Sequence, residues 1–255
     1  LVNVGLTEAA MFSPDGQILQ PSEILRKRPI LVERGNFRPV TLTHLDILKT
    51  SRAAFEEQLG ADRLNLISLM EITTQNPRDN TPLESNDFLA RADLLATIGQ
   101  PVLVSRFGEY YKLISFLRRY TSAPIALGLG AGALKEIFDQ RYYSNIEGGI
   151  MEALGRLFRP DVTAYIYPLA TDNSGLLTLS RFKPENNVEG LYQHLLSQGC
   201  LKELATTDSN FGRIESREAL RRIQTGDETW REIVPSSVAE MITDRKLFGY
   251  GSSLV

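Results

Sequence analysis

The sequence predicts an α/β protein built on a doubly wound, mostly parallel five-stranded sheet, followed by a C-terminal helical subdomain. Short apolar segments alternate with longer segments in which apolar residues recur at helical spacing, a pattern typical of parallel strands joined by crossover helices. The short segments are apolar at almost every position, as strands buried on both faces are. From residue 184 onward the pattern is nearly all helical. The chain therefore divides into an N-terminal extension (1–28), an α/β domain (29–183) and a helical part (184–255).

The α/β domain begins with a strand at 29–32, which ends before Gly35. A helix is expected at 42–59, where apolar residues recur every three or four positions. The second strand, 64–72, is nearly all apolar. The remaining elements continue the alternation, with helices at 88–98, 110–120, 133–138 and 151–158 and strands at 102–105, 125–129 and 162–167.

The two ends of the chain differ from this alternation. Residues 1–28 carry a turn at 13–16 and a short helix near 22–28, and we interpret them as an extension. A segment rich in Asn, Pro, Asp and Ser, 75–87, is expected to be a loop. The C-terminal part is expected to fold back over the sheet with helices at 188–198, 215–224 and 235–246.

The composition is that of an ordinary globular protein, with 255 residues of which 42% are hydrophobic and 23% charged. Lys and Arg number 28 against 31 Asp and Glu, so the net charge is −3, which argues against a general nucleic-acid binder. The single cysteine, Cys200, excludes an internal disulfide and fits a reducing compartment, so a cytoplasmic location is expected. Only two histidines, His44 and His194, are present, and no metal ligands are predicted.

The sequence contains no segment suited to a membrane. The longest apolar run, 123–134, has twelve residues including three glycines, too short to cross a bilayer. The N-terminus lacks the basic stretch and apolar core of a signal peptide. Because the chain begins with Leu1 instead of Met, an additional upstream domain is left open, as is a homo-oligomer.

The loop after the first strand carries the residues that point to chemistry. Open parallel sheets bind ligands at the carboxyl ends of their strands, and residues 33–47 read ERGNFRPVTLTHLDI. The loop lacks the second glycine of a dinucleotide fingerprint and the Gly-Lys-Ser/Thr of a P-loop. Thr41 and His44 lie three residues apart, on one face of a first helical turn whose free amides attract an anion. The structural alternative is that His44 only begins the helix.

This loop resembles the first motif of the HxGH nucleotidyltransferase superfamily, G-[ST]-F-[DN]-P-x-[HT]-x-G-H. The matching residues are Gly35, Phe37, Pro39, Thr41 and His44. Arg38 stands in place of Asp or Asn, and Thr43 replaces the glycine that lets the nucleotide lie against the backbone. The resemblance implies a Rossmann-like fold, with catalytic contacts to the ATP phosphates from His44 and Thr41 and a backbone cradle formed by Gly35, Asn36 and Phe37.

The superfamily's second motif, I-S-S-T-x-x-R or a close variant, opens a C-terminal helix that clamps the ATP phosphates. Residues 214–223 occupy that place here, with Ser216 at the second Ser and Leu220 where the clamping Arg belongs. The resemblance therefore assigns the clamp to Ser216, Arg217 and Arg221. The structural alternative is that Ser216 is a plain helix N-cap. The following WREIVP and SVAEMI segments are similar to the end of bacterial nicotinate-mononucleotide adenylyltransferases.

A third similarity lies after the fourth strand, where GAGAL resembles the G-A-D-x-L segment of the same enzymes. Gly132 stands in place of their Asp, and a tight glycine turn is the structural alternative. Gly130 and Gly132 are therefore candidates for the second substrate. Glu71, at the end of the second strand, could touch a ribose hydroxyl, and Phe107, after the third strand, could stack on a nicotinate ring.

The resemblance covers residues 29–247 and implies adenylyl transfer from ATP to nicotinate or nicotinamide mononucleotide, which gives a dinucleotide of NAD biosynthesis and pyrophosphate. The implied cofactor is Mg²⁺, held mainly by the ATP phosphates and water. The implied partners are ATP and a mononucleotide, with neither nucleic acid nor membrane.

The departures at 43, 132 and 220 leave two alternatives open. One is a degenerate homologue that binds a nucleotide or a partner without catalysis. The other is a nucleotidyltransferase that acts on a different phosphate-bearing acceptor.

Overall fold

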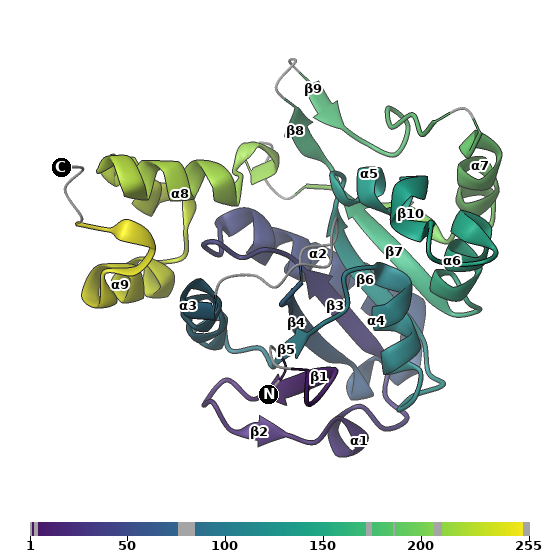
Figure 1. The fold of residues 1–255 in the computed structure, drawn as a ribbon, viewed down its shortest axis with the longest axis horizontal. Coiled ribbons are helices and arrows are strands. Elements are labelled where there is room, and N and C mark those ends of the chain that lie inside the picture. Colours follow the sequence, from purple (N-terminus) through teal and green to yellow (C-terminus); the bar gives the residue numbers. More distant parts are fainter. Residues whose placement is uncertain are drawn as a thin grey trace.

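One large sheet with helices on both faces forms the body of the molecule (Figure 1). The computed structural model describes residues 2, 5–75, 85–171, 175–185, 187–206 and 211–251, with only the backbone at 85–87, 171 and 211. The loop expected at 75–87 therefore falls mostly outside the described residues. The mostly parallel α/β architecture predicted from the sequence is confirmed.

The five predicted strands form the centre of the sheet and run parallel to one another. They are β3 (Ile30–Arg34), β4 (Ile67–Thr73), β5 (Val102–Ser105), β6 (Ile125–Gly130) and β7 (Val162–Tyr167). Their order in space is β7-β6-β3-β4-β5. The chain starts at β3, adds β4 and β5 on one side and then crosses to β6 and β7 on the other. The topological switch point, where ligands bind in such sheets, is therefore beside β3.

The sheet has eight strands, so the predicted number of five is wrong by three short edge strands. These are β1 (Ala9–Phe12), β2 (Ile18–Leu19) and β10 (Leu201–Glu203). β1 pairs antiparallel with β5 and with β2, and β10 pairs parallel with β7. Strands of two to four residues are too short to show a hydrophobic pattern, and their place depends on backbone hydrogen bonds to a neighbour.

Helices cover the two faces of the sheet in separate groups. One face packs against α4 (Tyr110–Leu117), α5 (Ala133–Ile137), α6 (Gly149–Leu157) and α7 (Glu189–Ser197). The other face packs against α2 (Leu42–Leu59) and α3 (Ser85–Ala96). Along β3, Ile30 and Val32 face the first group and Leu31 faces the second, so this strand is buried on both sides, as its apolar sequence predicts.

The C-terminal helices α8 (Ser216–Thr225) and α9 (Ser236–Arg245) lie together beside the sheet, on the α2 and α3 side (Figure 1). Trp230, in the 3₁₀ segment between them, is fully buried. α7 and β10 pack with the sheet, so the helical part begins after β10 and not at residue 184 as expected.

The N-terminal segment is part of the sheet edge. The turn expected at 13–16 is present, with the Gly16 amide donating to the Ser13 carbonyl over 2.9 Å, and it joins β1 to β2. The short helix is α1 (Pro21–Ile24). A separate antiparallel pair, β8 (Leu169–Thr171) and β9 (Gly175–Leu177), follows β7. None of the described helices has the length and apolar character needed to span a membrane.

Candidate active site

The loop between β3 and α2 lies at the carboxyl edge of the central strand, next to the switch point. The peptide bond between Arg38 and Pro39 is cis, and Phe37 has a φ of 46°. The Phe37 ring is fully buried, with its centroid 4.9 Å from that of the His44 ring. A Cβ atom on Gly35 would lie 2.9 Å from the Phe37 ring. Gly35 therefore gives room to the Phe37 ring, which in turn packs against His44.

His44 is held in one tautomer by Thr41. The Thr41 amide donates to Nδ1 of His44 over 3.0 Å, and the Thr41 hydroxyl lies 2.9 Å from the same nitrogen. A ring nitrogen that accepts from an amide carries no proton, so the neutral ring has its proton on Nε2. Burial lowers the pKa of His44 to about 4. At neutral pH the histidine therefore offers an uncharged Nε2–H donor.

Two hydrogen bonds join this loop to the start of the C-terminal helices. The Ser216 hydroxyl donates to the Pro39 carbonyl over 2.8 Å, and the Thr43 hydroxyl donates to the Ile214 carbonyl over 2.9 Å. Ser216 is the first residue of α8 and not its N-cap, which is Glu215. Thr43 is buried, so the side chain that replaces the motif glycine is used to hold Ile214. The two motif segments found in the sequence are thus in contact.

The two candidate arginines of α8 differ in their surroundings. Arg221 donates from Nε and Nη2 to the Glu218 carboxylate, each over 2.8 Å. Arg217 is exposed and, among the described residues, has no ion pair or hydrogen bond. Arg213, which the sequence analysis missed because it precedes the motif, is likewise exposed and unpaired in the described part of the chain. Arg213 and Arg217 are therefore the cations available beside Ser216.

A buried arginine that the sequence analysis missed contacts the same loop. Arg91 of α3 is 3% exposed, and its Nη1 donates to the Asn36 carbonyl over 3.1 Å. Asn36 itself is exposed. No local motif marks Arg91, because its role depends on α3 packing beside the loop after β3.

Glu71 and Phe107, the two candidates for the second substrate on β4 and after β5, belong to a buried network around Arg34. Arg34 pairs with the Glu71 carboxylate through Nε (2.5 Å) and Nη2 (3.0 Å). It also donates to the carbonyls of Phe107 (2.6 Å) and Gly108 (3.0 Å). Ser105 completes the set by donating to Glu71.

This network leaves the Glu71 carboxylate closed to a ligand and the Phe107 ring almost fully buried. Glu71 is fully buried, and both of its carboxylate oxygens are engaged by Arg34 and Ser105. The Phe107 ring is 6% exposed and packs on Phe116, with a centroid distance of 5.1 Å. The network instead anchors the loop after β5 to the strand that carries the first motif.

The two candidate glycines after β6 differ from each other. A Cβ on Gly130 would lie 2.6 Å from the Leu169 side chain, so this glycine is needed for packing. A Cβ on Gly132 would meet nothing within 4 Å. Gly132 therefore opens onto free space at the start of α5.

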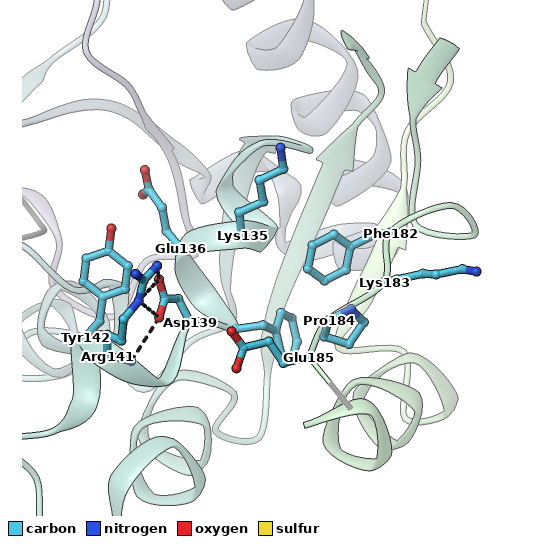
Figure 2. A pocket seen from close by; sticks show the side chains of 10 residues that line it. Lys135, Glu136, Asp139, Arg141, Tyr142, Phe182, Lys183, Pro184 and Glu185 are labelled. Carbon is cyan, nitrogen blue, oxygen red and sulfur yellow. Dashed lines mark hydrogen bonds and ion pairs between the residues drawn. The ribbon is translucent and has the colours of Figure 1, made fainter. Parts of the chain in front are cut away.

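A cavity of about 540 Å³ lies beside α5 and is shown in Figure 2. Phe138 and Phe182 supply apolar surface. Glu136 lies close enough to the Arg34 network for its charge to raise the pKa of Arg34 and of Tyr110. The charges around the cavity balance, with three cations and three carboxylates: Lys135, Arg141, Lys183, Glu136, Asp139 and Glu185. In the described part of the chain, no three His, Cys, Asp or Glu side chains gather where they could hold a metal ion.

Comparison with solved structures shows the fold of nicotinic acid mononucleotide adenylyltransferases. The Plasmodium falciparum enzyme complexed with NaAD is 14% identical, with a TM-score of 0.55 over 88% of this chain and 98% of that chain. The same enzyme complexed with APC is 13% identical, with a TM-score of 0.53 over the same shares. No family model and no curated protein matches the sequence.

Proposed function

We propose that this chain transfers the adenylyl group of ATP to nicotinate or nicotinamide mononucleotide, giving a dinucleotide and pyrophosphate. The observation that carries the proposal is the contact between the two motif segments, in which Ser216 bonds to Pro39 across 177 positions of sequence. One segment contributes the neutral donor of His44, and the other contributes Arg217. The fold shared with nicotinic acid mononucleotide adenylyltransferases over 88% of the chain supports the assignment.

The reaction requires positioning and charge neutralisation more than acid–base chemistry. A phosphate oxygen of the mononucleotide attacks the α-phosphorus of ATP, and the bond from that phosphorus to the bridging oxygen of the β-phosphate breaks. Nε2–H of His44 would donate to a phosphate oxygen, while Thr41 keeps the ring in the required tautomer. Arg217 and Arg213 would neutralise the charge that develops on the leaving pyrophosphate.

Mg²⁺ would accompany ATP and reduce the charge of its phosphates. The nearest acidic residue of α2, Asp46, is buried and accepts a hydrogen bond from Tyr167. The side chains in contact with His44 are those of Thr41 and Phe37, and neither is a typical metal ligand. The ion would therefore be held mainly by phosphate oxygens and water.

The mononucleotide would bind in the cavity beside α5. Lys135 and Lys183 line this cavity and would pair with the phosphate of the acceptor, whereas Arg141 is held by the Asp139 carboxylate. Glu71 and the Phe107 carbonyl bind Arg34, which directly precedes the first motif. Neither residue contacts the acceptor in this proposal.

Calorimetric titration with ATP·Mg²⁺, followed by pyrophosphate release with a panel of phosphate-bearing acceptors, tests the proposal. We expect ATP to bind and pyrophosphate to form with one or both mononucleotides. The variant Arg217→Gln should weaken ATP binding. The variant Arg221→Gln should leave ATP binding unchanged, because Glu218 already balances the charge of Arg221. Binding without turnover would indicate a degenerate homologue, and turnover with another acceptor alone would contradict the named substrate.

A further inference from the structure

A second cavity, of about 470 Å³, lies over the outer side of α4 and differs in charge from the cavity beside α5. Four cations line it, Arg106, Lys112, Arg119 and Arg156, against one carboxylate, Glu8. The chain as a whole has a net charge of −3, so this local excess of positive charge runs against the composition. The cavity beside α5, in contrast, has equal numbers of cations and carboxylates.

The four cations come from separate parts of the fold and converge on one place. Arg106 follows β5, Lys112 lies on α4, Arg119 follows α4 and Arg156 is in the last turn of α6. Two of them lie near the Tyr111 ring, with Lys112 Nζ and the Arg156 guanidinium carbon each 5.9 Å from its centroid. Tyr111 is 8% exposed, so it forms a fixed surface against which these two side chains rest.

Three of the cations have carboxylate partners. Lys112 pairs with Glu109 at 2.8 Å, Arg119 with Glu8 at 2.5 Å, and Arg156 pairs with Glu152. The Glu109 side chain is only 10% exposed, whereas the Arg119–Glu8 and Arg156–Glu152 pairs lie at the surface, where an ion pair contributes about 0–1 kcal/mol. A guanidinium has five donors and an ammonium three, so these three cations keep donors for phosphate oxygens.

The number of cations around the cavity favours an anion with several phosphate groups. The four cations come from separate segments and surround a space of about 470 Å³. A chain of two or three phosphates offers more oxygens than a single phosphate group, so it can contact more of these cations at once.

We propose that this cavity is a second anion site, which binds an oligophosphate such as a nucleoside triphosphate or inorganic tripolyphosphate. Phe107 lines the cavity, and its carbonyl is held by Arg34, the residue directly before Gly35. The proposal does not rest on adenylyl transfer, because it concerns binding at residues outside that site.

The test is calorimetric titration of the whole chain with tripolyphosphate, ATP and AMP, without acceptor. The variant Lys112→Gln with Arg119→Gln should remove one binding site for tripolyphosphate or ATP, or weaken it at least tenfold. A matched control, Arg52→Gln with Arg245→Gln, removes the same charge from exposed arginines that are also ion-paired, to Glu56 and Asp93. The control should retain the parent's number of sites and affinities within about twofold.

The source of the phosphates is decided by comparing the ligands. If the double variant loses affinity equally for tripolyphosphate and ATP, the phosphate chain is what the site recognises. If it loses affinity for ATP alone, the nucleoside contributes to binding. The proposal is overturned if the double variant binds like the parent, if the control loses as much, or if AMP binds this site as tightly as ATP.

Discussion

Thr41 selects the tautomer of His44, and burial keeps the ring uncharged at neutral pH. Together they make Nε2–H of His44 a neutral hydrogen-bond donor. Replacing His44 with Ala removes the preorganised donor that we propose for the ATP phosphates. By comparison with oxyanion-hole donors, the loss should be on the order of 3 kcal/mol, or about a hundredfold in kcat. The measurement is the steady-state rate of pyrophosphate release. His194→Ala is the control, since His194 is the other histidine and is exposed on α7; a His44→Ala protein as active as this control would refute the role.

Glu33 is the least expected buried residue of the sheet. It is 1% exposed, and both of its carboxylate oxygens are buried without a hydrogen-bond partner among the described residues. It lies two positions after Leu31 on β3, so its side chain is on the sheet face covered by α2. Burial raises the pKa of Glu33 well above its usual range. The folded chain therefore keeps a proton that the unfolded chain loses.

The free energy of unfolding should consequently fall as the pH rises from about 4.3, the ordinary pKa of Glu, toward the raised value. Glu33→Leu removes the buried polar group and should stabilise the chain at pH 8 by about 1–3 kcal/mol. The gain should shrink as the pH is lowered. Urea unfolding of parent and variant at pH 5 and pH 8 measures both effects. Equal free energies of unfolding for parent and variant at pH 8 would contradict the destabilisation that we assign to the buried Glu33 side chain.

At the scale of elements, the β3–α2 loop owes its shape to the packing of Phe37 over Gly35. Gly35→Ala places a methyl group 2.9 Å from the buried ring, which must move away from His44. Overpacking of this kind costs about 1–3 kcal/mol, and we also expect weaker ATP binding. Gly132→Ala is the matched control: its φ is −58° and the added methyl group meets nothing, so its effect on stability should stay within about 0.5 kcal/mol. Denaturant unfolding and ATP titration of the two variants provide the comparison; similar behaviour would exclude the steric explanation.

The predicted elements show which patterns carry local information. The helix expected at 42–59 has those bounds in the structure, and the central strands match within a few residues. β1 and β10 escaped prediction because three or four residues are too few to show a period of their own. Their pairing with β5 and β7 is settled by backbone hydrogen bonds across the sheet.

At the scale of the whole molecule, hydrogen bonds from Thr43 and Ser216 link the β3–α2 loop and the start of α2 to the C-terminal helices. Thr43→Val keeps the side-chain shape but leaves the Ile214 carbonyl without this donor, which should cost about 1 kcal/mol. Amide hydrogen exchange in α8 should become faster, while exchange in α4 stays unchanged. Thr50→Val is the control, because the Thr50 hydroxyl bonds to the Asp46 carbonyl within α2. Equal exchange rates of α8 in the two variants would show that the link does not hold the helices in place.

The sequence by itself determined the parallel core and most of the helices, because burial on both faces and helical periodicity leave their mark in neighbouring residues. It also pointed to the two motif segments that we propose as the site. Only the tertiary structure decided which side chains of those segments are available. Arg221 is paired with Glu218 while Arg217 is free among the described residues, and Glu71 is engaged by Arg34 from 37 positions away. Thr43, a departure from the motif glycine, binds a carbonyl 171 positions away. Such pairings depend on distances in space between remote residues, and no local pattern of hydrophobicity or spacing encodes them.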